Sequence, residues 1–201
     1  MGYFSYLRKR RLTGWLYRRL RLYPRLCKHL EGRVLDVGCG IGDFLNFRSG
    51  TVGVDIDASA VAWCRNLGLD AHLMTPDALP FDSATFDAVV LDNVLEHLGA
   101  PNALLSDIKR VLSAHGSLIV GVPGRLGYAS DPDHKIYYDE TALVACLLRN
   151  GFHCEQVIHM PKRSTLLAAC MRQYCLYGIF RLTPEPDELA SPVQRAALAR
   201  G

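Results

Sequence analysis

The sequence predicts an α/β fold in which helices cover both faces of a doubly wound, mainly parallel sheet. Short apolar runs alternate with segments of helical pattern, and strands separated by helices pair in parallel. The run VLDVGCGIGD at residues 34–43 is typical of a buried strand, a glycine-rich turn and the start of a helix. With 201 residues, the chain is long enough for one domain with a sizeable core.

The predicted elements follow one another along most of the chain. Strands are expected near residues 33–37, 51–54, 71–74, 86–91, 117–121 and 153–159, and helices near 42–47, 58–67, 102–113 and 139–150. Pro101 stands just inside the start of one helix and Gly151 just past the end of another, where these residues are favoured. In such a sheet, ligands bind beyond the carboxyl ends of the strands, where the strand order reverses.

The glycine-rich turn is the first candidate binding site. Glycines allow positive φ and let a ligand approach the backbone closely. A turn before a helix also presents backbone N–H groups to an anionic or polar ligand. The spacing is Gly-x-Gly-x-Gly rather than the Gly-x-Gly-x-x-Gly of dinucleotide sites, and Asp36 stands just before it. A carboxylate there would attract an amine and repel a pyrophosphate.

Two more acids follow later strands. Asp55 ends the apolar run at 51–55, where a carboxylate can accept two hydrogen bonds from a ribose diol. Its alternative role as a helix N-cap suits Asp57 better. Asp77 and Ala78 follow the third strand, where an acid beside apolar residues suits an amino-purine, although an ordinary turn is the other interpretation.

Together these segments resemble the class I S-adenosylmethionine-dependent methyltransferases. The matching segments are 34–43, 52–57, 77–81, 86–90, 94–98 and 110–116, and the resemblance covers roughly residues 24 to 159. The small-molecule branch that includes ubiquinone and menaquinone biosynthesis methyltransferases is the most similar. The resemblance implies a Rossmann-like fold and S-adenosyl-L-methionine as cofactor, with S-adenosyl-L-homocysteine as product.

The resemblance also implies roles for individual residues. The methionine end of the cofactor would lie on Asp36 and on the turn that contains Gly38, Cys39, Gly40 and Gly42. Asp55 would bind the ribose, with Ile56 beside it. Asp77 and Ala78 would bind the adenine, and Asn93 would lie near the methyl group. No metal is expected.

Two histidines are candidate catalytic residues, because methylation of a hydroxyl requires removal of a proton and histidine is the usual base. His97 follows the fourth strand, and His134 lies in the loop after the fifth. The alternative for His97 is a structural role through Glu96. In the family, the stretch that matches His134 to Tyr137 lies near the acceptor pocket, but the sequence does not assign a base.

The N-terminal 30 residues differ in charge from the rest. They contain nine Lys or Arg and no acid, whereas the remaining 171 residues, with 14 basic and 20 acidic side chains, carry a net charge of −6. As a helix, this arm would be amphipathic, with Trp15 and Leu20 opposite the arginines, and Pro24 would kink it or start a new helix. Such helices lie in anionic membrane interfaces, here through residues 3–28, or simply cover a domain. The strong basicity favours the membrane slightly over a simple cover.

The C-terminal part is expected to depart from the family. In place of the usual last strand, apolar residues at helical spacing over residues 164–180 predict an amphipathic helix, which would pack on the sheet or meet a lipid-like substrate. The predicted organisation is therefore a basic arm (1–30), a core (31–160), a helical extension (161–183) and a flexible tail (184–201).

The composition is consistent with a cytoplasmic enzyme. The seven cysteines are scattered without a Cys-x-x-Cys pair, which favours a reducing compartment and argues against a zinc site. Neither a signal peptide nor a membrane span is expected. We expect a methyltransferase for a small or lipid-linked acceptor, such as a saccharide or quinone-like hydroxyl, peripheral to the inner membrane if the arm binds lipid. A silent cofactor-binding scaffold is the alternative. RNA methylation is disfavoured by the acidic core.

Overall fold

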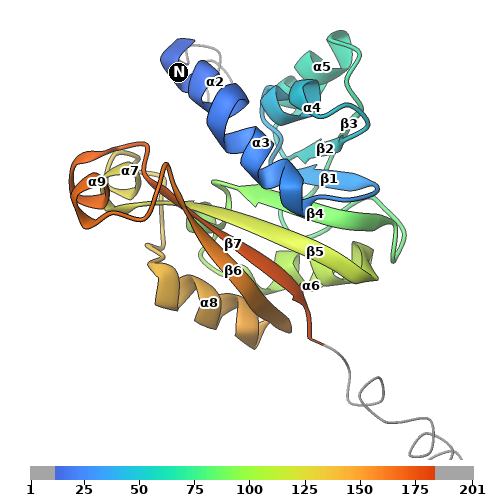
Figure 1. The fold of residues 1–201 in the computed structure, drawn as a ribbon. Coiled ribbons are helices and arrows are strands. Elements are labelled where there is room, and N and C mark those ends of the chain that lie inside the picture. The colour runs from blue at the N-terminus through green and yellow to red at the C-terminus, as the bar shows by residue number, and fades with distance from the viewer. Residues whose placement is uncertain (1–11, 184–201) are drawn as a thin grey trace, which may run out of the picture.

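The computed structural model describes residues 12–183, so the predicted tail at 184–201 and the first part of the arm lie outside the described residues. A seven-stranded sheet has helices on both faces, which confirms the predicted α/β architecture (Figure 1). The strands are β1 (Val34–Val37), β2 (Val52–Asp55), β3 (Ala71–Leu73), β4 (Phe86–Asp92), β5 (Leu112–Pro123), β6 (Phe152–Met160) and β7 (Cys175–Leu182). Their order is β3-β2-β1-β4-β5-β7-β6. The order reverses between β1 and β4, which predicts a ligand site at their carboxyl ends.

The helices divide between the two faces of the sheet. One face carries α6 (Asn102–Val111) and α8 (Glu140–Arg149), and the N-terminal helices cover part of the other (Figure 1). Each face of the sheet carries its own hydrophobic core, and alternate strand residues point into one or the other. Val34 and Val90 pack with the N-terminal helices, whereas Leu35 and Leu91 pack with α6 and α8. The helices α4 (Asp43–Phe47) and α5 (Ala58–Asn66) follow β1 and β2 at the expected positions.

The basic arm is helical over the part that the structure describes. It runs through α2 (Leu12–Tyr17), a π-helical turn η1 (Arg18–Leu22), α3 (Tyr23–Leu26) and a short 3-10 turn η2 (Cys27–His29). Pro24 lies in the first turn of α3, where its missing N–H is tolerated, and the wider π turn precedes it. Tyr23, Leu26 and Leu30 are buried against the sheet.

The predicted C-terminal helix over residues 164–180 is wrong for most of its length. Only α9 (Thr165–Cys170), capped by Ser164, is helical, and β7 follows it as an antiparallel strand between β5 and β6. Residues Leu176 to Phe180 are buried, because a central strand is covered on both faces. The helical extension predicted for 161–183 is therefore a short helix and a strand of the core sheet.

None of the helices over residues 12–183 has the length and apolar content of a membrane span.

Candidate cofactor pocket

A pocket lies at the carboxyl ends of β1 and β4, between the glycine turn and the N-terminal helices. Its wall contains five of the predicted cofactor residues: Asp36, Gly38, Cys39, Gly40 and Asn93. The sequence reasoning missed other lining residues, which are Arg18, Tyr23 and Leu26 from the arm, Ile41, Asp43 and Phe44 after the turn, and Val90 and Asp92 from β4. The arm therefore forms one wall of the pocket.

The glycine turn is closed by hydrogen bonds within the protein. The N–H groups of Gly38 and Cys39 both donate to the Val54 carbonyl, at 2.8 and 2.9 Å, and the Gly40 N–H donates to Asp55 Oδ2 at 2.8 Å. The Gly42 N–H donates to the Cys39 carbonyl at 3.0 Å. The prediction that this turn offers bare N–H groups to an anion is therefore wrong at these four positions, because the turn uses its donors to fix its own shape.

Gly42 needs the conformation that only glycine adopts readily. Its φ is +79° at the start of α4, and a Cβ there would meet Leu69 Cδ1 at 2.6 Å and Cys64 Sγ at 2.9 Å. Gly42 thus sets the direction of α4 and does not line the pocket. Cys39 lines the pocket, and it also belongs to the small core with Leu45 and Cys64.

Carboxylates dominate the electrostatics of this pocket. Asp36 is buried and makes no hydrogen bond with residues 12–183 through its side chain; burial, and then the charges of Asp92 and Asp55, hold its pKa well above the ordinary value. Asp43 and Asp92 line the same pocket, with Arg18 as its lining cation among the described residues. This charge set suits a positively charged ligand such as a sulfonium with an amine.

Asp92 was not predicted from the sequence but organises the floor of the pocket. Its carboxylate accepts hydrogen bonds from the Tyr177 hydroxyl at 2.9 Å and from Asn93 Nδ2 at 2.7 Å. Arg18 Nη1 lies 3.6 Å from the other carboxylate oxygen. Burial disfavours the charged guanidinium, but Asp92 together with Tyr23 and Tyr177 outweighs this effect, so the pKa of Arg18 is raised. Asn93 adopts a positive φ of 56° at this corner.

Asp55 links the glycine turn to β2. Its two carboxylate oxygens accept from the N–H groups of Gly40, at 2.8 Å, and Asp57, at 2.9 Å. Burial raises the pKa of Asp55, and these two hydrogen bonds partly oppose that shift. Ile56, the next residue, is an exposed apolar side chain with 63% of its surface accessible. The pair thus offers a carboxylate beside an apolar surface, which suits a ribose and a base. Asp57 is the N-cap of α5, as expected.

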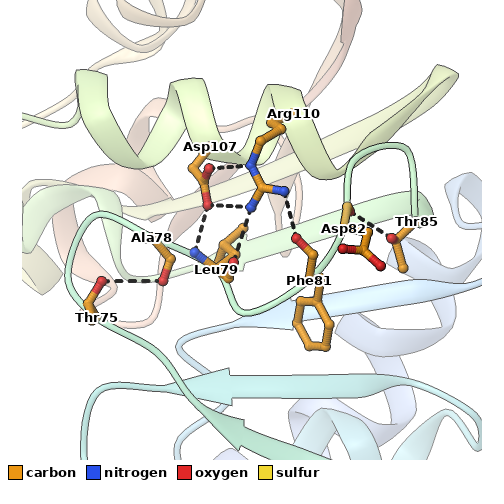
Figure 2. A network of polar contacts seen from close by, with 8 residues as sticks. All are labelled: Thr75, Ala78, Leu79, Phe81, Asp82, Thr85, Asp107 and Arg110. Atoms are coloured by element: carbon orange, nitrogen blue, oxygen red, sulfur yellow. Dashed lines mark hydrogen bonds and ion pairs between the residues drawn. The ribbon is translucent and has the colours of Figure 1, made fainter.

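The loop that carries Asp77 and Ala78 is braced from α6 (Figure 2). Arg110 donates to the carbonyls of Leu79, at 3.1 Å, and Phe81, at 2.6 Å, and binds Asp107 through two nitrogens. Asp107 in turn accepts from the Leu79 N–H at 2.6 Å. Asp77 and Ala78 themselves are exposed at the carboxyl end of β3 and do not line the pocket. This brace fixes the loop without using their side chains.

The two predicted catalytic histidines lie together at the end of β4. Glu96 and His97 are in the short 3-10 turn η3 (Leu95–His97), and the ring of His134 packs edge-on against His97 at 4.6 Å between centroids. Glu96 is buried, and burial raises its pKa to about 8. The pKa of His97 is lowered by burial and by His134. None of the three lines the pocket, so they form a separate cluster next to it.

Comparison with known proteins identifies the core. Residues 35–120 match the model of a family described as a methyltransferase domain. Residues 35–120 are a methyltransferase domain. A probable S-adenosylmethionine-dependent methyltransferase of Mycobacterium tuberculosis is 28% identical to the chain over 173 residues, which cover 83% of the chain and 58% of that protein. The cofactor of the methyltransferase domain in this chain is S-adenosyl-L-methionine, in agreement with the prediction.

Other relatives of the methyltransferase domain have different substrates in their names. A ubiquinone biosynthesis O-methyltransferase of Parvibaculum lavamentivorans is 32% identical over 128 residues, or 51% of the chain and 50% of that protein. A probable tRNA methyltransferase 9B of Homo sapiens is 31% identical over 112 residues, or 51% of the chain and 25% of that protein. The chain spans about half the length of the curated relatives it matches.

Solved structures show the same fold. A SAM-dependent methyltransferase from Aquifex aeolicus superimposes with a TM-score of 0.66 over 90% of the chain and 98% of its own, at 19% identity. The chain therefore has the fold of this structure. Its antiparallel β7 replaces the helix that the sequence predicted there. The acid-rich pocket at the β1–β4 switch point, where the Asp36 side chain makes no hydrogen bond with residues 12–183, fits the cationic cofactor of this domain.

Proposed function

We propose that this protein transfers a methyl group from S-adenosylmethionine to a hydroxyl of a small amphiphilic or lipid-linked acceptor, saccharide or quinone-like, at an anionic membrane surface on the cytoplasmic side. The observation that carries this proposal is the double role of the N-terminal helices. One part of them forms a wall of the cofactor pocket, and another part exposes apolar and basic side chains to the outside.

The residues of the pocket and of the neighbouring strand ends have complementary tasks toward the cofactor. Asp36, whose carboxylate lacks a hydrogen bond within residues 12–183, binds the amine of the methionine end. Asp55 uses its remaining lone pairs for the ribose hydroxyls, and Ile56 covers one side of the base. Asp77 and Ala78 bind the adenine edge on the loop that Arg110 holds. Asn93 lies at the methyl end, between the pocket floor and the turn η3.

The chemistry is an in-line displacement, so positioning contributes much of the rate. The bound cofactor supplies an electrophilic methyl group on a sulfonium. An acceptor oxygen forms the new C–O bond as the C–S bond breaks, and the hydroxyl proton must leave. Glu96 and His97 lie three and four residues beyond Asn93, and His134 comes from the loop after β5. We assign the removal of this proton to these three residues.

The outer surface of the arm supports membrane binding. Trp15, Leu16 and Leu20 expose 40%, 40% and 69% of their surface on α2 and η1, next to exposed Arg21. Arg19 lies over the Trp15 ring at 5.1 Å. Apolar side chains interleaved with arginines suit the interface of an anionic bilayer. Each basic residue near such a surface contributes about 1 kcal/mol.

Co-sedimentation with vesicles tests the membrane part. The double variant Leu16→Ser/Leu20→Ser keeps Arg18 and the pocket wall, so binding to vesicles of phosphatidylglycerol and phosphatidylcholine should fall several-fold. Leu148→Ser, an exposed leucine on α8, is the matched control and should bind as the natural chain does. Equal sedimentation of the double variant and the natural chain would remove the membrane from the proposal.

Labelled S-adenosylmethionine tests the acceptor. Incubation with a fractionated extract should place label in the lipid or lipid-linked saccharide fraction. Label in RNA instead would favour the second candidate, RNA methylation, which the tRNA methyltransferase relative and the arginines of the arm support. If the protein binds the cofactor but labels no fraction, it acts as a scaffold and the enzymatic proposal is wrong.

A further inference from the structure

Glu96, His97 and His134 place three possible metal ligands around one point. One ligand atom from each lies within 4.8 Å of the other two. Glu96 and His97 come from η3 at the end of β4, and His134 comes from the loop between α7 (Arg125–Tyr128) and α8. That loop is held in place because the N–H groups of Lys135 and Ile136 donate to the Glu96 carbonyl at 2.8 and 3.1 Å. The backbone therefore fixes the spacing of the cluster.

The Glu96 carboxylate is buried without a hydrogen bond. The residue is 1% exposed, and neither side-chain oxygen has a hydrogen-bond partner among residues 12–183. A polar group that is buried without a partner destabilises the folded protein, a charged group more than a neutral one, and a bound cation or donor removes that cost. Such a group calls for an explanation, and a bound ion is one.

The orientation of His134 points to the same conclusion. Its Nδ1 lies 2.8 Å from the Tyr128 carbonyl, which can only accept, so Nδ1 carries the proton. In the neutral ring Nε2 then carries a lone pair, and this atom lies 3.7 Å from Glu96 Oε1. The lone pairs of Nε2 and of the Glu96 carboxylate repel each other, so a cation or a proton between them would stabilise this arrangement. A backbone carbonyl on the second ring nitrogen is also the usual support of a metal-binding histidine.

We propose that Glu96, His97 and His134 bind a divalent transition-metal ion of the zinc type. Two imidazoles and one carboxylate are a typical donor set for zinc and its neighbours, whereas magnesium and calcium prefer oxygen alone. Ligands at about 2.0–2.2 Å around a tetrahedral ion lie roughly 3.3–3.5 Å apart, close to the observed 3.7 Å between Nε2 and Oε1. Asp131 Oδ2, 3.9 Å from the same Nε2, is a further donor within reach.

The position of the site gives the ion a task. Glu96 follows Asn93 of the pocket wall by three residues, and the charge of Asp92 on the pocket floor acts on Glu96. An open position on the ion would bind the acceptor oxygen and lower the pKa of its hydroxyl, so that solvent water would take up the proton and no histidine base would be needed. This task rests on the proposed function, but the metal site itself does not.

Cobalt titration tests the site without any acceptor or cofactor. The full chain, stripped with a chelator, should bind one equivalent of Co²⁺ with visible d–d absorption, and Zn²⁺ should displace it. His134→Gln and Glu96→Gln should each weaken binding tenfold or more, whereas His72→Ala, at a half-buried histidine on β3, should bind normally. If Glu96→Gln does not fold, His97→Asn, which changes a half-buried ring, replaces it.

The alternative to an ion is a proton shared by Glu96 and His134. In that case the natural chain binds no stoichiometric cobalt, or the His134 and Glu96 variants bind it equally well, and either result overturns the proposal. Because these measurements involve no methyl transfer, they can fail while the proposed activity holds, and the activity can fail while the metal site holds.

Discussion

Arg18 Nη1 lies 3.6 Å from Asp92 Oδ2, so the N-terminal helices are tied by charge to the end of β4 at the floor of the pocket. About a quarter of the Arg18 side chain is accessible, and Asp92 is more deeply buried. The same carboxylate holds Tyr177 of β7. The arm is therefore part of the pocket wall, and any contact that it makes with a membrane acts directly beside the cofactor.

Removal of the Arg18 charge should destabilise the fold. In Arg18→Met the buried Asp92 loses its cation, and we expect the free energy of unfolding to fall by about 1–3 kcal/mol, less than for a fully buried pair. Asp92→Asn added to this variant should restore part of the loss. Urea unfolding measures both, with Arg21→Met, an exposed arginine, as control. An equal loss in the control would show that the ion pair is not responsible.

Asp107 should stabilise the Asp77 loop in a pH-dependent way. The hydrogen bonds from Arg110 hold the pKa of Asp107 below its ordinary value, against the opposing effect of burial. For such a group the stabilisation is present above about pH 4 and is lost as the pH falls through the lowered pKa of the folded state. Asp107→Asn should therefore cost about 1 kcal/mol at neutral pH and nothing at strongly acid pH.

Thermal unfolding of the natural chain and of Asp107→Asn across this pH range checks the prediction. A gap between the two melting curves that stays constant down to the acid limit would contradict it.

Cofactor binding should release a proton from Asp36. Burial and the neighbouring acids raise the pKa of Asp36, so part of the free protein carries a neutral carboxyl, whereas a bound ammonium requires the ionised form. Affinity for S-adenosylmethionine should rise as the pH rises through this raised pKa. Asp36→Asn should weaken binding about 10–100-fold and remove the pH dependence. Calorimetry in two buffers of different ionisation enthalpy counts the proton; release that persists in the variant would exclude Asp36.

The central position of β7 should make Gly178 intolerant of a side chain. Gly178 pairs with Val120 of β5 and Val157 of β6, and a Cβ there would collide with the buried ring of Phe180. Gly178→Ala should lower the free energy of unfolding by about 1–3 kcal/mol through overpacking. Gly99→Ala, where the nearest atom is 3.7 Å away, is the control and should change little. Denaturant unfolding that shows no difference between the two variants would mean that β7 is not packed as described.

The strands and helices of the core were predictable because each shows a local pattern. The error at β7 has a physical cause: its residues are covered on both faces, so the period-two alternation of a half-exposed strand is absent. Tyr174 and Cys175 happen to continue the helical spacing that begins in α9. The segment forms a strand because it pairs antiparallel with β5, which lies more than 50 residues away in the sequence.

Asp36 was predictable as a residue of the pocket wall, because a strand end and the following turn fix its position by sequence distance. Asp55 does not line the pocket, so its cofactor role stays a prediction. The pairing of Arg18 with Asp92 and of Glu96 with His134 was not predictable, because each joins distant segments. An acid at the end of an apolar strand, as at Asp92, was the signal available in the sequence. The sequence also did not show that the N–H groups of the turn are used within the protein, because they donate to Val54 and Asp55 on the neighbouring strand.

Binding of S-adenosylmethionine tests the central claim most directly. Isothermal titration of the full chain should show one site. Asp55→Asn should lower the affinity tenfold or more, because Asp55 is both the proposed ligand of the ribose and the acceptor that holds the Gly40 N–H. Asp70→Asn, at an exposed acid before β3, should bind as the natural chain does. A natural chain that binds no S-adenosylmethionine, or an Asp55→Asn variant that is folded and binds with unchanged affinity, would contradict the account.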